Sequence, residues 1–340
     1  MHATKSPKRF TTHLNRHAPT ILICGIFLFF SGLLYMSFCG MPAERSAQSP
    51  ALGEKNQNSK HVEMHNKMLS AFMVVAILTG RQNRERRDMI RQTWLSNVTK
   101  DIVPYFVIGT KDLTPEEMSH LKLENKKTND LLLLPDVHDA YEKLADKVLQ
   151  MYIWLDANVH FHYIFKGDDD TFARVDVIAE ELKRKKQQRL YWGFFSGRAH
   201  VYRRGKWAEK EWVLCDRYLP YALGGGYILS SDLIHYIANS ANYLQKFKSE
   251  DVSVGAWLAP VELNRVHDTR FDTEYKSRGC SNKYIVTHKQ TTELMKQKFA
   301  SIQMSGRLCK KEVKLRNSYE YDWEALPSQC CTRTNNTNIP

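Results

Sequence analysis

The sequence predicts an α/β domain with a largely parallel sheet, and two observations support this fold class. Short apolar runs typical of buried strands alternate with helical patterns through the first half of the chain. One of these runs, Tyr163–Phe165, leads into the adjacent carboxylates Asp168, Asp169 and Asp170. Open α/β sheets bind their ligands at the carboxyl ends of strands, so such a cluster lies where a functional site is expected.

The first half of the chain has the pattern of four strands separated by three helices, without an internal repeat. The predicted strands cover Leu69–Leu78, Tyr105–Ile108, Leu131–Leu134 and Tyr163–Phe165. The predicted helices cover Arg84–Leu95, a segment that opens at Thr114-Pro115-Glu116-Glu117, and Asp139–Asn158. A Thr N-cap, a Pro at N1 and a Glu at N3 are typical of a helix start, so the second boundary is well defined.

The second half is less regular. Strands are expected over Leu190–Phe195 and Tyr284–His288, with a hairpin or loop over Arg198–Trp212 and a glycine-interrupted apolar stretch over Tyr221–Leu229. Helices are expected after Ser230 or Ser231, from Ser249 to before Pro260, and over Gln290–Ile302. A cysteine-bearing tail follows.

Composition limits the class of protein but not its partner. Of 340 residues, 43% are hydrophobic and 25% charged, as in ordinary globular proteins. There are 49 Lys and Arg against 37 Asp and Glu, a net charge of +12. A basic surface attracts anions, and nucleic acid, nucleotides and acidic polysaccharides all satisfy that condition.

The N-terminal region predicts a membrane anchor. Residues 18–39 contain no charged side chain, and about 20 such residues span a bilayer as a helix. The nearby basic residues all precede this segment, which places the N-terminus in the cytosol. A cleaved signal peptide is the alternative, although its apolar core is normally shorter, about 7–15 residues. The predicted organisation is a cytoplasmic tail 1–17, a transmembrane signal-anchor 18–39, a stem 40–67 and a lumenal catalytic domain 68–340.

A lumenal domain has chemical consequences. It argues against nucleic acid as a partner, and it makes the sequons at Asn97 and Asn335 accessible to N-glycosylation. Disulfides also persist there, and the cysteines of this part are Cys215, Cys280, Cys309, Cys330 and Cys331. We expect one disulfide between Cys215 and Cys280, and a second between Cys309 and one of the adjacent pair. Because five is odd, at least one thiol is free, bonded between chains, or paired with Cys39.

The Asp triplet is the strongest chemical feature. Three adjacent carboxylates repel one another, so bringing them together in a fold is costly unless a cation is present. Mg²⁺ and Mn²⁺ prefer such oxygen ligands and often bind substrate phosphates as well. His288, at the end of a predicted strand, could add an imidazole ligand of the kind that Mn²⁺ tolerates. The alternatives are a solvated acidic turn and a structural histidine.

Other motifs have a functional and a structural interpretation. One carboxylate of Glu250-Asp251 could act as a general base, or the pair could simply favour a helix start. The glycines Gly224–Gly226 could let a substrate approach the backbone, or form a turn. The basic residues after the first strand, which could meet a diphosphate or form a solvated helix face, are Arg84, Arg86, Arg87 and Arg91. The tryptophans, suited to sugar stacking or to core packing, include Trp192, Trp207, Trp212 and Trp257.

Taken together, these motifs resemble the beta-1,3-galactosyltransferase family (glycosyltransferase family 31). The matching segments, in order, are Arg87–Trp94, Asp139–Tyr141 with Lys147, Asp168–Asp170, Gly224–Tyr227 and Glu250–Val252. Further segments are similar to the branch of the family that adds the second galactose of the glycosaminoglycan linkage region; these are Tyr191–Arg198, Ser249–Pro260, Arg270–Tyr275 and Cys330-Cys331.

The resemblance implies a GT-A-type nucleotide-sugar-binding fold with a mixed, mostly parallel central sheet. It implies a Golgi type II enzyme that uses UDP-galactose and Mn²⁺ to form a β1,3 bond to galactosyl-β1,4-xylose of a proteoglycan. By the family pattern Asp170 and His288 bind the metal, and Asp251 is the base. The residues implied in donor binding are Asp168, Asp169, Arg87, Arg91, Lys147, Gly225 and Gly226, with the first two shared between metal and donor.

Three alternatives remain open from the sequence. A related β1,3-glycosyltransferase would differ in its donor or acceptor. A glycosidase would use two of these carboxylates and would need neither metal nor nucleotide. A membrane-anchored lectin would retain the fold without turnover.

Overall fold

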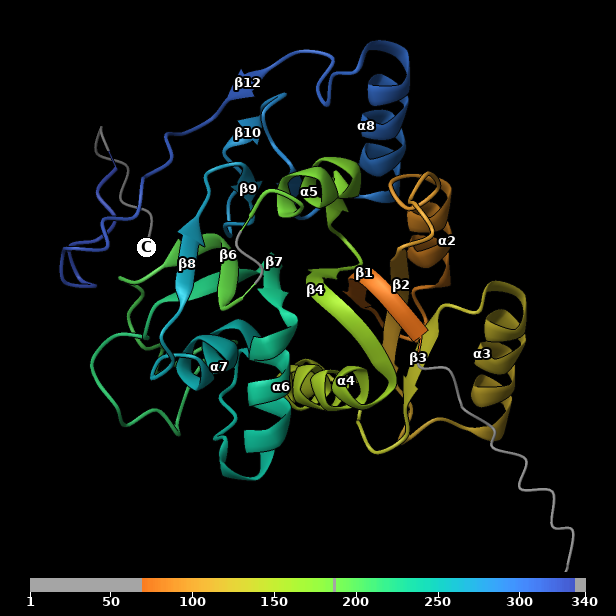
Figure 1. The fold of residues 1–340 in the computed structure, drawn as a ribbon, viewed down its shortest axis with the longest axis horizontal. Helices are drawn as coiled ribbons and strands as arrows, with labels where there is room; N and C mark the ends of the chain where they lie inside the picture. Colours follow the sequence, from red (N-terminus) through yellow and green to blue (C-terminus); the bar gives the residue numbers. More distant parts are fainter. Residues whose placement is uncertain (1–68, 186–187, 334–340) are drawn as a thin grey trace, which may run out of the picture. The chain divides into compact units, whose positions relative to one another are not determined.

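The structure, a computed structural model, describes residues 69–185 and 188–333 (Figure 1). The predicted tail, signal-anchor and stem lie outside these residues, as do Cys39 and Asn335. Among the residues that are described, no helix combines the length and the apolar character needed to cross a bilayer.

The main sheet has seven strands, of which one runs against the others. From edge to edge they are β3 (Leu131–Leu134), β2 (Ile102–Gly109), β1 (Leu69–Leu78), β4 (Val159–Asp168), β7 (Tyr221–Ser230), β6 (Leu190–Ser196) and β8 (Asn264–His267). Neighbouring strands pair in parallel except that β7 is antiparallel to both β4 and β6. The sequence-based prediction of an α/β domain with a mixed, mostly parallel sheet is therefore confirmed.

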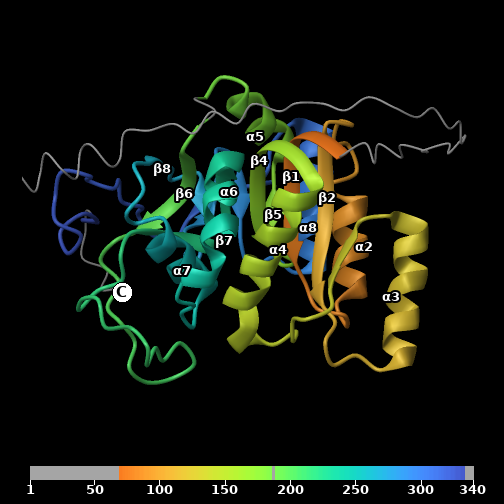
Figure 2. The ribbon, with the colours of Figure 1, turned by 60° about the horizontal axis from the view of Figure 1, so that its bottom comes forward.

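Helices cover both faces of this sheet (Figures 1 and 2). One face carries α4 (Leu144–Asn158), α6 (Ser231–Ser240) and α7 (Glu250–Trp257). The other carries α2 (Arg84–Gln92), α5 (Val175–Leu182) and α8 (Thr292–Ser305), while α3 (Pro115–Thr128) lies beside β3. Two 3₁₀ turns, Tyr141–Lys143 and Ala241–Tyr243, precede α4 and follow α6. Because both faces are covered, the central strands can be apolar on both sides.

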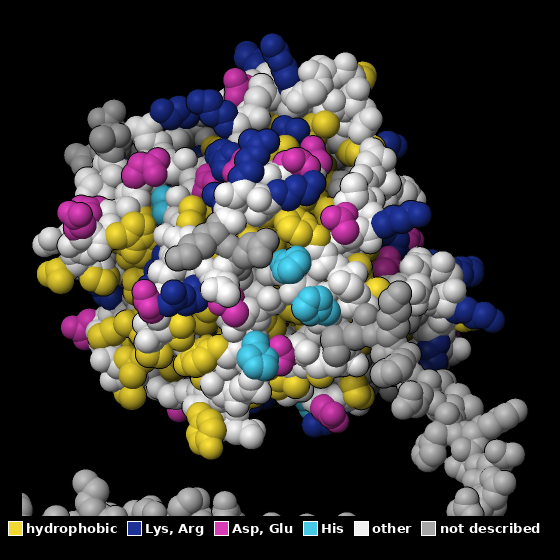
Figure 3. Space-filling view, viewed as in Figure 1, with side chains coloured by type: hydrophobic (Ala, Val, Ile, Leu, Met, Phe, Trp, Pro, Cys, Tyr) yellow, Lys and Arg dark blue, Asp and Glu magenta, His cyan; other side chains and the backbone are white. Residues whose placement is uncertain are grey.

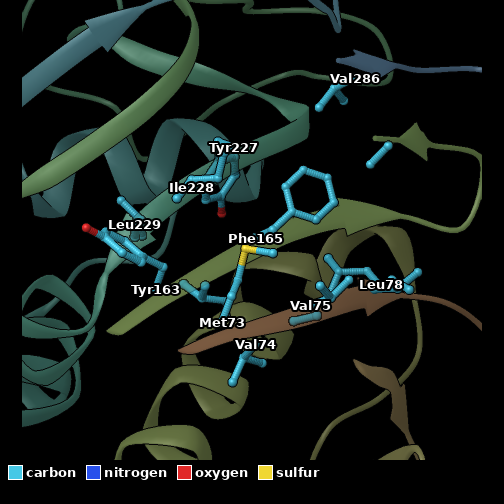
Figure 4. Close-up of a cluster of buried hydrophobic side chains, with 14 of the residues drawn as sticks. Met73, Val74, Val75, Leu78, Tyr163, Phe165, Tyr227, Ile228, Leu229 and Val286 are labelled. Atoms are coloured by element: carbon cyan, nitrogen blue, oxygen red, sulfur yellow. The ribbon is translucent and has the colours of Figure 1, made fainter. Parts of the chain in front are cut away.

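The core is centred on β1, β4 and β7. Residues Met73 to Leu78 of β1 are all buried, which accounts for their continuous apolar run. Figure 4 shows the side chains of this run, among them Met73 and Leu78, in one cluster with Phe165 of β4, Tyr227 of β7 and Val286. This packing fixes the carboxyl end of β4, where the Asp triplet begins.

Two small sheets were not predicted from the sequence. One contains β5 (Phe172–Ala173), β11 (Val286–Thr287) and β9 (Phe271–Asp272), and the other contains β10 (Gly279–Cys280) and β12 (Val313–Lys314). The strand expected over Tyr284–His288 is thus only two residues long. Strands this short have no readable alternation, so long-range pairing alone defines them.

The observed helix boundaries show where local sequence patterns predicted the starts and ends of helices correctly. The capping box is present: the Glu117 N–H donates to Thr114 Oγ1 (3.3 Å), and the Thr114 N–H donates to the Glu117 carboxylate (2.9 Å). The helix expected to reach Leu95 ends at Gln92, where the Thr93 hydroxyl donates back to the Met89 carbonyl (2.7 Å). Helix α5 was not predicted. Its buried residues nevertheless have helical spacing: Val175, Ile178, Ala179 and Leu182.

The expected disulfide pairing is wrong. Cys280 bonds to Cys309, the neighbours Cys330 and Cys331 bond to each other, and Cys215 is a free, exposed thiol. Spacing along the chain does not encode which thiols meet in space, and here β10 places Cys280 beside the segment after α8. Asn97 of the first sequon is exposed, as glycosylation requires.

The surface charge is spread out on the face seen in Figure 3. Lys and Arg side chains there have Asp and Glu side chains among them. On this face the positive charge is therefore distributed, and does not form one basic stripe of the kind that binds a nucleic-acid backbone.

Candidate active site

The Asp triplet lies at the carboxyl end of β4, in the middle of the main sheet. Asp168 is the last residue of the strand, and Asp169 and Asp170 form the turn that precedes β5. Thr171 fixes this turn, because its Oγ1 accepts from the Asp168 N–H (3.3 Å) and donates to the Gly225 carbonyl (2.7 Å). The triplet is therefore anchored to both β4 and β7.

The small sheet brings His288 to the triplet. β11 pairs with β5, and the Gln290 N–H donates to the Asp170 carbonyl (2.7 Å), so the chain after β11 lies against the turn. His288 Nε2 is 2.9 Å from Asp170 Oδ1 and 3.5 Å from Asp168 Oδ2. One potential ligand atom from each of the three residues lies within 4.8 Å of the others. Two carboxylates and an imidazole are a donor set that Mn²⁺ accepts.

The electrostatics of this cluster favour a cation. Burial alone would raise the pKa of Asp168, but the Lys166 ammonium and His288 hold it well below its usual range. Burial alone would lower the pKa of His288, but Asp168 and Asp170 raise it to about 9. Asp168 thus remains ionised, and the raised pKa of His288 reflects a negative field that a divalent ion would satisfy.

Asp169 faces a different set of groups. Its Oδ2 accepts from the Thr79 hydroxyl (2.7 Å) and the Asn83 amide (2.7 Å), and Arg86 lies 3.5 Å from Oδ1. Burial raises its pKa, with these donors acting in the opposite direction. Asp169 is therefore held by the β1–α2 turn and lies outside the Asp168–Asp170–His288 cluster, a division that the sequence analysis left open.

Each glycine of β7 has a close neighbour. A Cβ on Gly224 would lie 2.7 Å from Glu250 Oε1, and one on Gly225 would lie 2.6 Å from the His288 ring. These two glycines therefore make room for the carboxylates and the imidazole, and both line the site. Gly226 instead packs against Val286, with 2.8 Å left for a Cβ, and does not line the site. Of the two glycines predicted to bind the donor, the structure thus places Gly225 at the cavity and Gly226 in the packing behind it.

Asp251 is a carboxylate of the site that does not belong to the cation cluster. It lies in the first turn of α7, where its Oδ2 accepts from the Gly224 N–H (2.9 Å) and its Oδ1 from the Val252 N–H (2.8 Å). Burial raises its pKa, which those two N–H groups counteract in part. An oriented carboxylate with a raised pKa is suited to accept a proton.

Lys166, which the sequence analysis did not select, connects the two carboxylate groups. It is fully buried, and its Nζ donates to Asp168 Oδ1 (2.9 Å), the Gly224 carbonyl (2.7 Å) and Glu250. Burial alone would lower its pKa, but Asp168 and Glu250 raise it well above the usual value. Burial raises the pKa of Glu250 to about 8, although Lys166 acts in the opposite direction. The Glu250 carboxylate is therefore engaged by an ammonium group, whereas Asp251 accepts its hydrogen bonds from backbone N–H groups. The alternation of side chains along β4 could have identified Lys166, because residues 166 and 168 lie on the same face of the strand.

Lys147 lies in the wall of the site. Its buried Nζ donates to the Thr79 carbonyl (2.7 Å) and to Asp139 Oδ1 (2.5 Å). Burial lowers its pKa, and Asp139 opposes that shift. The side chain thus joins α4 to the end of β1, in a position compatible with the predicted contact to donor.

The structure places the two arginines that were predicted to bind the donor away from the cavity. Arg87 is fully buried, pairs with both oxygens of Glu124 (2.8 and 2.7 Å), and donates to the Gly80 carbonyl (2.6 Å). Arg91 pairs with Glu124 (2.8 Å) and Asp130 (2.8 Å). Neither lines the site. Their guanidinium groups join α2 to α3 and β3, because buried carboxylates there supply stronger partners than solvent does.

From this placement we expect substitution of Arg87 to lower the stability of the protein without changing its affinity for the sugar donor. Arg87→Met should lower the free energy of unfolding by about 3 kcal/mol, because it breaks a buried ion pair. The KM for the sugar donor should stay within about twofold of the wild-type value. Chemical denaturation and donor kinetics measure the two quantities, with the half-exposed Arg84→Met as the control. A raised donor KM with unchanged stability would restore a donor-binding role for Arg87.

These groups share a cavity of about 930 Å³. Its carboxylate and imidazole lining includes Asp168, Asp169, Asp170, Glu250, Asp251 and His288. Its aromatic lining includes Trp207, whose Nε1 donates to the Tyr141 hydroxyl (2.6 Å) and whose ring lies 5.5 Å from that of Tyr275. The other tryptophans named above are core residues: Trp192, Trp212 and Trp257. The cavity thus combines a cluster suited to a cation, a separate carboxylate and an apolar surface of the kind that sugars contact.

Comparisons with known proteins agree on one family. The model of the Galactosyltransferase family matches residues 85–269. The chain is 50% identical over 309 residues to "Beta-1,3-galactosyltransferase 6" of Mus musculus, an alignment that covers 89% of this chain and 94% of that protein. It is 33% identical over 240 residues to "Hydroxyproline O-galactosyltransferase GALT2" of Arabidopsis thaliana, covering 66% of this chain and 34% of the relative.

Among solved structures, the chain resembles "Mannosyltransferase PcManGT from Pyrobaculum calidifontis in complex with GDP-Man and Mn2+" with a TM-score of 0.35 and 11% identity. That match covers 58% of this chain and 54% of the other, and at this level it carries no argument. The family model and the mouse relative do. Both span the segments that place Asp168–Asp170 and Asp251 in one cavity, and they show that this chain belongs to the galactosyltransferase family.

Proposed function

We propose that the chain is an inverting β1,3-galactosyltransferase that moves galactose from UDP-galactose onto galactosyl-β1,4-xylose of the proteoglycan linkage region. The observation that carries the chemistry is that Asp251 shares a cavity with the Asp168–Asp170–His288 cluster without belonging to it. The acceptor and the donor sugar rest on the 50% identity to the mouse relative and on the motifs shared with the linkage-region branch. A GT-A-type fold is part of the proposal.

The cation would be Mn²⁺, held by Asp170, His288 and Asp168. The donor set fits, since its hard oxygens and its imidazole nitrogen face one another across less than 4.8 Å. When bound, such an ion neutralises the charge of a departing diphosphate. Asp169, Lys147 and Gly225 are the remaining donor-binding positions in this proposal.

The transfer step requires one proton acceptor. The acceptor hydroxyl oxygen bonds to the anomeric carbon as the bond from that carbon to the UDP oxygen breaks, with inversion. The hydroxyl proton passes to the Asp251 carboxylate. The N–H groups of Gly224 and Val252 orient that carboxylate, and each of its oxygens keeps a lone pair for the proton. Binding both substrates in one cavity contributes further to the rate.

The cellular setting is proposed from the sequence. Residues 18–39 would anchor the protein in the Golgi membrane as a single-pass type II protein, with 1–17 cytosolic, 40–67 as a stem and 68–340 lumenal. Galactose addition to a secreted proteoglycan requires a catalytic domain on the lumenal side, which the distribution of charge around the apolar segment favours.

The test is an assay of the full-length chain with a panel of UDP-sugars and a galactosyl-xyloside acceptor, with and without Mn²⁺. We expect transfer from UDP-galactose that a chelator abolishes, with a β1,3 linkage in the product. Transfer from a different UDP-sugar would identify a related β1,3-glycosyltransferase. Chelator-resistant hydrolysis would identify a glycosidase, and sugar binding without turnover would identify a lectin.

A further inference from the structure

One wall of the cavity is built from segments with no role in the proposed mechanism. Thr273, Glu274 and Lys276 follow β9, and Arg316 and Arg333 come from the C-terminal segment; all five line the cavity. This wall adjoins the metal-binding end, because β9 pairs with β11 and the His288 N–H donates to the Asp272 carbonyl (3.1 Å).

The wall carries an excess of buried positive charge. Arg278 lies 3.1 Å from Asp272 and 3.2 Å from Glu274, Arg316 lies 3.3 Å from Glu274, and Arg333 contacts the other oxygen of Glu274. Every one of these residues is at most 9% exposed. Three guanidinium groups therefore share two carboxylates. Guanidinium groups stay protonated in proteins, so one of the three positive charges has no carboxylate of its own in this group, although Arg278 and Arg333 also stack on aromatic rings.

Several donors of the wall also lack an acceptor. Among the described residues, Nε and Nη1 of Arg316 and Nε of Arg333 are buried without a hydrogen-bond partner. Glu274 Oε2, although close, accepts no hydrogen bond, so the guanidinium of Arg316 is not directed at it. The Nη2 of Arg316 instead donates to the Lys276 carbonyl. Buried donors without partners are rare and costly, which indicates that an external acceptor completes the wall.

We propose that Arg316 and Arg333 form an oxyanion-binding subsite in the wall of the active-site cavity, for a phosphate-type group. Planar guanidinium groups bind such oxyanions through paired N–H donors. Two sources carry this chemistry: the diphosphate of the nucleotide donor, and a charged group on the acceptor. Naming these sources rests on the proposed function, whereas the subsite itself rests on the arginines alone.

The first test uses inorganic pyrophosphate and full-length protein freed of metal. Without a divalent ion the Asp triplet repels this probe, so binding reports on the basic residues of the cavity, and the Arg316→Met variant isolates the contribution of the wall. We expect pyrophosphate to raise the Tm of the wild-type protein, and Arg316→Met to weaken its affinity about tenfold, the loss of one charge-assisted contact. Lys311→Met, an exposed change on the same segment, should behave as wild type. If pyrophosphate leaves the Tm of the wild-type protein unchanged, the proposal is overturned.

A second variant distinguishes binding from folding. Glu274→Gln removes the carboxylate that the three arginines share, so the charge excess grows and the affinity for pyrophosphate should increase. A merely structural arginine cluster would instead give unchanged or weaker binding in folded Glu274→Gln. That result, or equal affinity in wild type and folded Arg316→Met, contradicts the proposal. None of these measurements needs sugar transfer, so failure of the proposed function remains distinguishable.

The two sources are then separated by one comparison. Arg316→Met should raise the Kd for UDP with Mn²⁺ about tenfold, by calorimetry, if the donor diphosphate occupies the subsite. If a charged acceptor occupies it, UDP affinity will be unchanged and only the KM of an acceptor bearing a phosphate or sulfate will rise, relative to the neutral acceptor. An effect on neither quantity overturns the subsite as a substrate contact.

Discussion

Asp251→Asn will lower kcat for galactose transfer by about 10²- to 10⁴-fold, the contribution expected of a general base. An amide keeps the size of the carboxylate but has no basic oxygen, so it cannot take the hydroxyl proton. UDP with Mn²⁺ should bind within about twofold of the wild-type affinity, because Asp251 lies outside the Asp168–Asp170–His288 cluster. Transfer kinetics and calorimetry of UDP binding measure the two effects. Near-normal turnover of Asp251→Asn would exclude Asp251 as the base.

Asp176→Asn is the matched control for this change. Asp176 is the second residue of α5, as Asp251 is of α7, but it is exposed and lies outside the cavity. A pH profile adds an independent readout. Burial raises the pKa of Asp251, so wild-type kcat should fall with decreasing pH at values above the ordinary range of an aspartate. The residual activity of Asp251→Asn should lack that acidic limb.

Asp170→Ala will weaken metal-dependent binding of UDP by more than about 100-fold. Loss of a group that merely supports a ligand already costs about 10- to 100-fold in metal affinity, and Asp170 is a proposed ligand that lies 2.9 Å from His288 Nε2. Calorimetric titration of UDP at several Mn²⁺ concentrations measures this loss. Excess Mn²⁺ should recover part of the binding, because the remaining ligands are intact.

Asp136→Ala supplies the comparison for that experiment. Asp136 is exposed in the loop after β3 and does not line the cavity. The Asp136→Ala variant should bind UDP and Mn²⁺ with the affinity of the wild-type protein. If Asp170→Ala also bound UDP with unchanged affinity and unchanged dependence on Mn²⁺, Asp170 would not be a metal ligand, and the role of the triplet would have to be reassigned.

Features that depend on neighbours along the chain could be predicted from the amino-acid sequence. The apolar run of β1, the capping box at Thr114 and the position of the Asp triplet at the end of β4 follow from periodicity and local hydrogen bonding. The residue pattern also selected His288 and the Glu250-Asp251 pair, and the family resemblance assigned their roles. These signals were sufficient for the α/β class and for both ends of the site, because adjacent carboxylates and helix caps express their chemistry within a few residues.

Only the tertiary structure decided which groups meet across the fold. It paired Lys166 with Glu250, and it brought His288 to Asp170 through two-residue strands without a local signature. It also assigned Arg87 to Glu124, and it collected Arg316 and Arg333 around Glu274. The physical reason is that a charged side chain takes whichever partner the packed core brings within reach. The identity of that partner is set by strand register and burial, which a charge pattern along the chain does not contain.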